Sequence, residues 1–372
     1  MKKQILIKIF LIFIILTIGS CKQDPIFKTI SQEEKQLDPH IEGSPTNFVE
    51  FKNKMYVASG KTLYRYEGTK DKDRGIGNWH DFSIDGHIWQ LAATDTTMYA
   101  LCEGSVKNVI KISSNGSAWN NEIYIPDEIS VQSIYAVNNQ VFIGAGILKS
   151  FTIYRLDGND FTFLTETQNR LLNGAASDGT DCYLIAKDME AGTGSTYRID
   201  IGGAAVTIDS STPFMGILNI GSVIVAISRN GTLYNITNNF SKGPRLNGGG
   251  NEKFATGALA VWTDPITSNK LLLVGRQDEP KFNVNYLHGY QELELDSSGN
   301  ITGNTFHDPG INFPLSTIDN NASYKSNMEK NPVKHLYQDK NNSEYILFAS
   351  TETKGVWSYR QRGDKKLWNA EQ

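Results

Sequence analysis

Aromatic, acidic and histidine side chains gather in two stretches of this 372-residue chain that show no strand-like pattern. One stretch runs from Arg276 to His288 and the other from Gly303 to Pro332. The side chains in them that suit contact with a partner are Asp278, Phe282, Tyr286, His288, His307, Asp308, Phe313 and Tyr324. Aromatic rings in a polar loop offer contact area at a small cost in conformational entropy, which favours recognition. The alternative is that these rings only pack the two loops onto the fold.

A second candidate is the tripeptide Arg362-Gly363-Asp364, which resembles the integrin-recognition sequence. The resemblance implies adhesion at an exposed hairpin tip, which we expect Arg360, Lys365 and Lys366 to keep solvated. Gly-Asp is also common in tight hairpins, because both residues tolerate the backbone angles that such turns require. The plain turn is the favoured interpretation, and adhesion is the alternative.

Patterns typical of catalysis or metal binding are weak. The sequence contains no HExxH, GxSxG, GxxxxGK[ST] or dinucleotide-binding motif. The six histidines are scattered, and only His80 and His87 are placed to meet near one site. We expect Cys102 and Cys182 to be buried free thiols, because neither has a CxxC partner or an adjacent histidine. We therefore assign no catalytic residue and predict neither a metal nor a cofactor.

The elements that must position the two stretches repeat along the chain. A four-residue phrase occurs seven times, from Leu63–Tyr66 to Val356–Tyr359, with mostly apolar second and fourth positions and a polar third position. This alternation is typical of a half-buried strand. A more apolar run precedes each copy, for example Val141–Gly144, and indicates a strand buried on both faces. The repeat recurs about every forty residues, a period typical of propeller blades.

Each unit predicts four antiparallel strands, so seven units predict an all-β protein: a seven-bladed β-propeller over residues 47–372. The units begin near residues 47, 88, 131, 171, 214, 254 and 333. Each blade uses one continuous stretch of chain, so we expect the ring to close by packing of the first blade against the seventh. A β-sandwich or β-helix is the alternative.

In a propeller, the loops between second and third strands leave the same face as the loops between blades. We call this the loop face, and the opposite one the turn face. Both stretches belong to the sixth blade, one between its second and third strands and the other before the seventh blade. They should therefore lie side by side on the loop face. Long loops of this kind often carry function.

Residues Ser113 to Trp119 resemble, one residue short, the Asp-box turn of sialidase-like propellers. In those families an acidic side chain holds the turn and an aromatic residue packs into the blade. Asn115 stands where the acid is expected, and other blades keep only fragments such as Asp157-Gly158. The resemblance implies a structural propeller turn and no sugar cleavage.

The N-terminus predicts the cellular location of the protein. A charged Met1–Lys3, an apolar stretch from Ile9 to Ile18 and the small residues before Cys21 are typical of a secretory signal over residues 1–20. The sequence before Cys21 resembles the lipobox of bacterial lipoproteins, which implies cleavage there and attachment of acyl chains such as palmitate. The polar residues 21–46 predict the lipidated cysteine and a flexible tether. An uncleaved transmembrane anchor is the alternative, but the apolar run is short for one.

The net charge of −4 gives no reason to expect nucleic acid. We predict a monomeric lipoprotein of the cell envelope, on its periplasmic or outer surface, that binds a protein or glycan through the loop face. The alternatives are an envelope enzyme of glycosidase, lyase or quinoprotein type at the axial funnel, and a scaffold for outer-membrane assembly. The phrase Gly231–Tyr234 resembles the repeats of the barrel-assembly propeller lipoprotein and its quinoprotein relatives, which have eight blades.

Overall fold

The computed structural model describes residues 40–71, 76–147, 150–188, 192–200, 202–246, 253–263, 268–278, 289–307, 331–340, 346–362 and 365–371. Residues 38–372 form one compact unit. Over the described ranges, no helix has the length and apolar character needed to cross a membrane.

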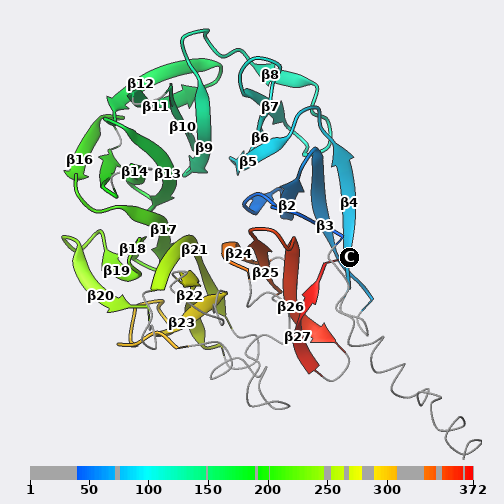
Figure 1. Ribbon diagram of the computed structural model, residues 1–372, viewed down its shortest axis with the longest axis vertical. Coiled ribbons are helices and arrows are strands. Elements are labelled where there is room, and N and C mark those ends of the chain that lie inside the picture. The colour runs from blue at the N-terminus through cyan, green and yellow to red at the C-terminus, as the bar shows by residue number, and fades with distance from the viewer. Residues whose placement is uncertain are drawn as a thin grey trace, which may run out of the picture. The chain divides into compact units, whose positions relative to one another are not determined.

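Seven antiparallel sheets surround a common axis, each with its first strand innermost (Figure 1). The strands, blade by blade, are β1 (Val49–Phe51), β2 (Lys54–Ser59), β3 (Thr62–Asp71) and β4 (Ile76–Ser83); β5 (Ile88–Ala93), β6 (Met98–Cys102), β7 (Val109–Ser113) and β8 (Asn121–Ile123); β9 (Val131–Val137), β10 (Gln140–Ile147), β11 (Ser150–Asp157) and β12 (Asp160–Glu166); β13 (Arg170–Ser177), β14 (Cys182–Asp188), β15 (Gly194–Ile199) and β16 (Ala205–Asp209); β17 (Phe214–Ile220), β18 (Val223–Ser228), β19 (Thr232–Asn235) and β20 (Ser241–Arg245); β21 (Lys253–Thr263), β22 (Lys270–Asp278) and β23 (Tyr290–Leu295); and β24 (Val333–Gln338), β25 (Leu347–Thr351), β26 (Val356–Arg362) and β27 (Lys365–Ala370).

The sixth sheet has three named strands, and residues 301–307 take the fourth place beside β23. Leu295 and Ile301 form one antiparallel bridge, and Glu292 and His307 form another. Phe306, between these bridges, is fully buried against the core of blades five and six. The predicted seven-bladed propeller with four-stranded blades is therefore confirmed.

The second strand of each blade is the most buried, because it lies between two neighbouring blades. In β18, the side chains of Ile224, Val225, Ala226 and Ile227 are all fully buried. Most fourth strands face solvent, as β20 does, whereas β27 buries Trp368 and Asn369. The apolar runs of the sequence thus become the layers that hold successive blades together.

Side-chain amides also join the inner strands of successive blades. The Asn47 amide donates to Leu91 O at 2.8 Å and accepts from Leu91 N at 3.0 Å. Gln338 makes the same pair of bonds with Thr263, both at 3.0 Å. Other amide bonds link Gln90 with Ile134, Asn173 with Phe214 and Asn219 with Ser177, and the Ser133 hydroxyl donates to Leu172 O. The polar residues of the inner strands therefore fix how neighbouring blades sit.

A buried ion pair of blade seven contacts blade one where the ring closes. The Arg360 guanidinium bonds the Glu371 carboxylate, and their side chains are 1% and 0% exposed. The same carboxylate accepts the indole N–H of Trp79 in blade one at 2.6 Å. Arg360 also donates to the Tyr66 hydroxyl at 3.2 Å and lies 5.6 Å from the Phe348 ring centre. The expectation that Arg360 is solvated is wrong, because its strand β26 packs against blade one.

The chain before β1 takes part in this closure. Ile41 is fully buried, and its carbonyl accepts from Val356 N at 3.0 Å. Gly43 forms a parallel bridge with Lys354, in the loop between β25 and β26. Residues 40–46, which the sequence analysis placed in the tether, therefore pack onto the propeller at the loop face.

Candidate functional site at the two ends of the axis

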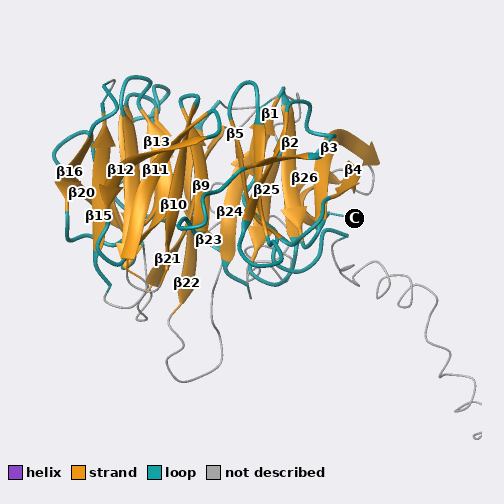
Figure 2. Ribbon diagram, turned by 90° about the horizontal axis from the view of Figure 1, so that it is seen from above, coloured by secondary structure: helices purple, strands orange, loops and turns teal. Residues whose placement is uncertain are grey.

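The two long stretches of blade six begin and end beside one another on the loop face. Strand β22 ends at Asp278, and β21 and β22 reach past their neighbours at the lower edge of Figure 2. Gly289, which precedes β23, forms a parallel bridge with Pro332, which precedes β24. His307 exchanges two backbone hydrogen bonds with Glu292, both 2.8 Å long. The predicted side-by-side placement therefore holds for the described ends of both stretches.

Two of the predicted contact residues, Asp278 and His307, belong to the described part of the chain. Asp278 ends β22 opposite Lys253, and His307 is half-buried beside β23. Phe282, Tyr286, His288, Asp308, Phe313 and Tyr324 lie outside the described residues, as does Cys21. The second stretch is shorter than predicted: residues 303–307 belong to blade six, and Asn331 is buried.

The C-terminal tripeptide lies where the sequence placed it, in the hairpin between β26 and β27. Arg362 is the last residue of β26 and pairs with Lys365, the first residue of β27. Gly363 and Asp364 lie outside the described residues. The choice between a plain turn and an adhesive tip therefore stays a prediction.

Three basic side chains on the loop face are close enough for their charges to interact, at the end of the axis that we call the axial opening. Lys187 lies near the end of β14, and its Nζ is 3.8 Å from the sulfur of Met215. Burial lowers the pKa of Lys187, and the positive charges of Lys334 and Arg229 lower it further. We call these three residues the basic cluster. Blades four and seven are not neighbours in the ring, so Lys187 and Lys334 interact across the opening.

Carboxylates compensate the basic cluster only in part. Lys334 pairs with Glu352 at 3.2 Å, and the Arg229 guanidinium lies 5.8 Å from the centre of the Phe254 ring. Among the described residues, no carboxylate pairs with Lys187. The charges of Lys187 and Arg229 therefore favour the approach of anionic groups to the opening.

Sequence reasoning missed the basic cluster because its members lie far apart in the chain. A usable pattern exists, since a basic residue follows the apolar run of the second strand in three successive blades. These residues are Lys187, Arg229 and Arg276. Superposing the repeats by their second strands would have brought this pattern out.

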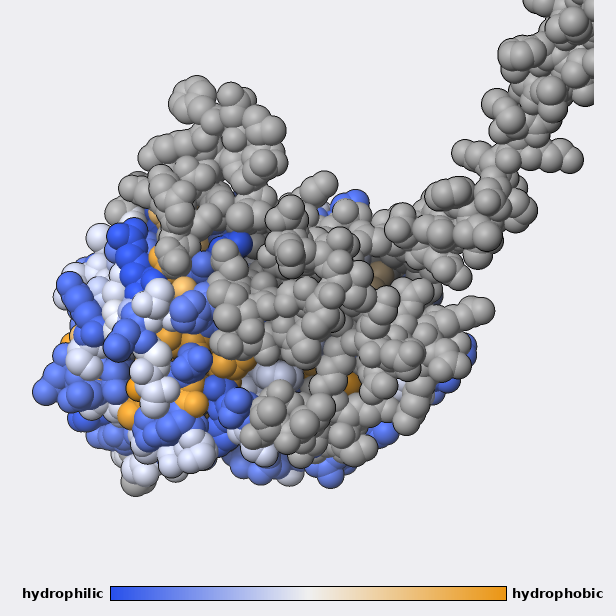
Figure 3. Space-filling model, turned by 90° about the horizontal axis from the view of Figure 1, so that it is seen from below, coloured by the Kyte–Doolittle hydropathy of each residue, from blue (hydrophilic) through white to orange (hydrophobic). Residues whose placement is uncertain are grey.

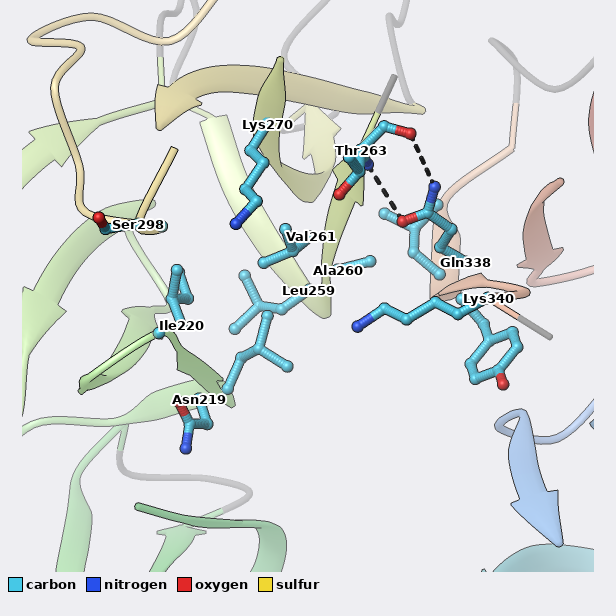
Figure 4. Close-up of a pocket in the computed structure, with 15 residues that line it drawn as sticks. Asn219, Ile220, Leu259, Ala260, Val261, Thr263, Lys270, Ser298, Gln338 and Lys340 are labelled. Carbon is cyan, nitrogen blue, oxygen red and sulfur yellow. Dashed lines mark hydrogen bonds between the residues drawn. The ribbon is translucent and has the colours of Figure 1, made fainter. Parts of the chain in front are cut away.

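A cavity of about 320 Å³ lies at the other end of the axis, on the turn face. It is lined by the ends of β17, β21 and β24, from blades five to seven, as Figure 4 shows. Leu259 and Val261 line it with apolar side chains, and the ammonium groups of Lys270 and Lys340 point toward it (Figure 4). Its volume lies within the range of small-molecule sites.

The histidines and cysteines considered in the sequence analysis pack against neighbouring side chains or lie buried in the fold. His80 packs on Phe82 with ring centres 4.6 Å apart, and His87 packs on Trp89 at 4.1 Å. No group of three or more His, Cys, Asp or Glu residues within the described ranges is placed to hold a metal. Cys102 and Cys182 are buried and free, as predicted. Burial raises the pKa of the Cys102 thiol to about 12, so it is inert as a nucleophile.

The Asp-box-like turn also forms. The Asn115 side-chain oxygen accepts two backbone N–H groups of the turn, each at 2.9 Å. Trp119 is buried, and its indole N–H donates to Gly116 O at 3.3 Å. Asparagine therefore replaces the acid in holding the turn, and the motif is structural here.

Exposed apolar side chains do not form an obvious contact patch on the described surface. Seen from below, this surface is mostly hydrophilic, with a small hydrophobic group between hydrophilic side chains (Figure 3). The exposed large hydrophobic residues are Trp89, Val106, Tyr124, Phe163 and Val206, spread over blades two to four. Single exposed residues of this kind are normal and need no function.

No protein-family model matches the chain, and no curated protein matches it. Solved structures share its fold. The GH74 xyloglucanase from Xanthomonas campestris aligns with a TM-score of 0.52 and 11% identity, covering 90% of this chain and 55% of that chain. BBS1N, crystallised in complex with ARL6DN, aligns with a TM-score of 0.51 and 10% identity, covering 91% and 97%. The extracellular domain of BT4673 from B. thetaiotaomicron aligns with a TM-score of 0.49 and 13% identity, covering 87% of this chain and only 39% of that chain. The similarities to the xyloglucanase and to BBS1N support the propeller fold.

Proposed function

We propose that this chain is an envelope lipoprotein, anchored through Cys21, that binds a protein or glycan partner through the loop face. The observation that carries the proposal is the convergence of both long stretches of blade six on that face, shown by the Gly289–Pro332 bridge. Long loops on a rigid scaffold are where proteins commonly place binding residues. The aromatic side chains of residues 279–288 and 308–330 suit such a contact.

The basic cluster gives the proposed contact a chemical preference. Lys187, Arg229 and Lys334 border the same face and act together at the axial opening. A lysine that is partly buried beside two like charges reduces stability, and such arrangements concentrate at functional sites. The partner should therefore present acidic groups, such as uronate or acidic side chains, toward the opening.

The proposed anchor supports the same arrangement. The described chain begins at the loop face, where His40 N donates to Glu371 O at 2.5 Å. Residues 21–39 could extend over roughly 60 Å at most, given the reach of an extended chain. A partner bound to the loop face would thus lie at or near the membrane surface.

The test is deletion of residues 308–330, with His307 joined to Asn331 by a short Gly-Ser linker. This deletion keeps the buried Phe306 and the Gly289–Pro332 bridge, so the propeller should fold. We expect cross-linking pull-downs from whole cells to lose the partner. A second variant keeps the length and composition of residues 308–330 but scrambles their order. It should also lose the partner, because we expect recognition to depend on the positions of the aromatic side chains. Unchanged capture by the deleted chain would contradict the proposal.

A second candidate is an envelope enzyme at the axial funnel, favoured by the lowered pKa of Lys187. Such an enzyme would turn over members of a panel of acidic glycans, and Lys187→Gln would remove turnover. A binding module would show no turnover, and the same substitution would weaken partner capture.

A further inference from the structure

The cavity on the turn face has a separate chemistry from the loop face. Its described lining includes two ammonium groups, on Lys270 and Lys340, and no carboxylate. The Lys270 Nζ donates to Ser297 O at 2.6 Å, which holds it at one edge of the cavity. Lys340 is exposed, and no described residue pairs with it. The charge of the lining is therefore uncompensated by the described residues.

Apolar side chains and a fixed amide form the rest of the wall. Leu259 and Val261 of β21 are half-buried and border the cavity between the two lysines (Figure 4). The Gln338 amide is held by both of its bonds to Thr263, so this side of the wall is rigid. A rigid, partly apolar cavity with few charged groups is typical of a small-molecule site.

We propose that this cavity binds a small organic anion. Its acidic head would lie at the exposed ammonium group of Lys340, its apolar body would rest on Leu259 and Val261, and the charge of Lys270 at the other edge would add to the attraction. The size of the cavity suits a molecule with a single ring or a short chain. The proposal is independent of the proposed function, because the cavity and the loop face lie at opposite ends of the axis.

The test compares three probes that share one ring and differ in head charge: benzoate, benzyl alcohol and benzylamine. Calorimetric titration would use the full chain, with titration of each probe into buffer as the blank. We expect benzoate to bind at one site and the neutral and cationic probes to bind at least about tenfold more weakly. Equal affinity for benzyl alcohol, or no saturable binding of benzoate up to about 10 mM, a weak limit for so small a ligand, would overturn the proposal.

Substitutions assign the binding to this cavity. Lys340→Gln should weaken benzoate binding about fivefold, the scale of one exposed charge contact, without affecting the fold. Lys242→Gln on the outer strand β20 is the matched control and should leave affinity unchanged. Val261→Phe should fill the cavity and abolish binding, with its thermal midpoint measured to confirm folding. Unchanged affinity in Lys340→Gln would overturn the proposal, and deletion of residues 308–330 should leave benzoate binding intact.

Discussion

Blades one and two meet in a different way from blades seven and one. At the first junction, the Asn47 amide bonds the backbone of Leu91, and apolar layers fill the rest. At the second, the Arg360–Glu371 ion pair lies buried among aromatic rings. An ordinary junction joins segments adjacent in sequence, whereas the closing junction joins the two ends of the ring.

The difference teaches how a ring without a shared strand stays closed. Blade one and blade seven each use one continuous stretch, so no strand passes between them. A buried ion pair contributes little net stability, but it penalises arrangements in which either charge is left alone. The Glu371 carboxylate bonds both Arg360 of blade seven and Trp79 of blade one. We infer that this pair selects the closed ring over an open one.

The substitution Glu371→Ala tests most directly whether the ion pair stabilises the closing junction. It leaves the Arg360 guanidinium buried without its partner, so the free energy of unfolding should fall by about 3–5 kcal/mol. Urea unfolding measures this change. The double variant Arg360→Met/Glu371→Leu should recover most of the loss, because it removes both charges.

Glu352→Ala is the control for this prediction. Glu352 pairs with Lys334 near the surface, so its loss should cost less than about 1 kcal/mol. A loss for Glu371→Ala as small as that for Glu352→Ala would show that the ion pair does not hold the closing junction, which would then depend on apolar packing and on the backbone hydrogen bonds of residues 40–43.

The same comparison shows which parts of the structure the sequence could predict. Strand order and burial follow from local alternation, so runs such as Val141–Gly144 identify the buried second strands directly. Arg360 looked like a solvated neighbour of a hairpin tip, because nothing local indicates that Glu371 folds back beside it. The ends of the two long loops could be placed from topology. The repeats could also have grouped Lys187 with Arg229, but not with Lys334, which lies on a first strand and interacts with Lys187 across the ring.

A smaller effect is expected at the ordinary junction. Asn47→Ala removes two hydrogen bonds to the backbone of Leu91, whose side chain is 1% exposed. A buried N–H and C=O left without partners should cost about 2 kcal/mol. Urea unfolding again measures the change, with the exposed Gln132→Ala as the control. A loss equal to that of Glu371→Ala would remove the distinction between the two kinds of junction.

Lowering the pH should give the smallest change in the free energy of unfolding. The residue concerned lies on β24, which borders the closing junction on one side and an amide-bonded junction on the other. Burial and the neighbouring Lys334 charge lower the pKa of His335 in β24 from its ordinary 6.5 to about 4. The unfolded chain therefore takes up this proton first as the pH falls. The contribution of His335 to stability is fully present above pH 6.5 and is lost progressively toward pH 4.

Comparison of the natural chain with His335→Gln isolates this contribution from the carboxylates that also titrate in acid. Between pH 7 and pH 4.5 the natural chain should lose roughly 1 kcal/mol more than the variant, because solvent screens the half-buried ring. Urea unfolding at both pH values measures the difference, with His80→Gln on β4 as the control. A parallel decline of the natural chain and His335→Gln would mean that the inner strand of blade seven admits the charged imidazole at no cost.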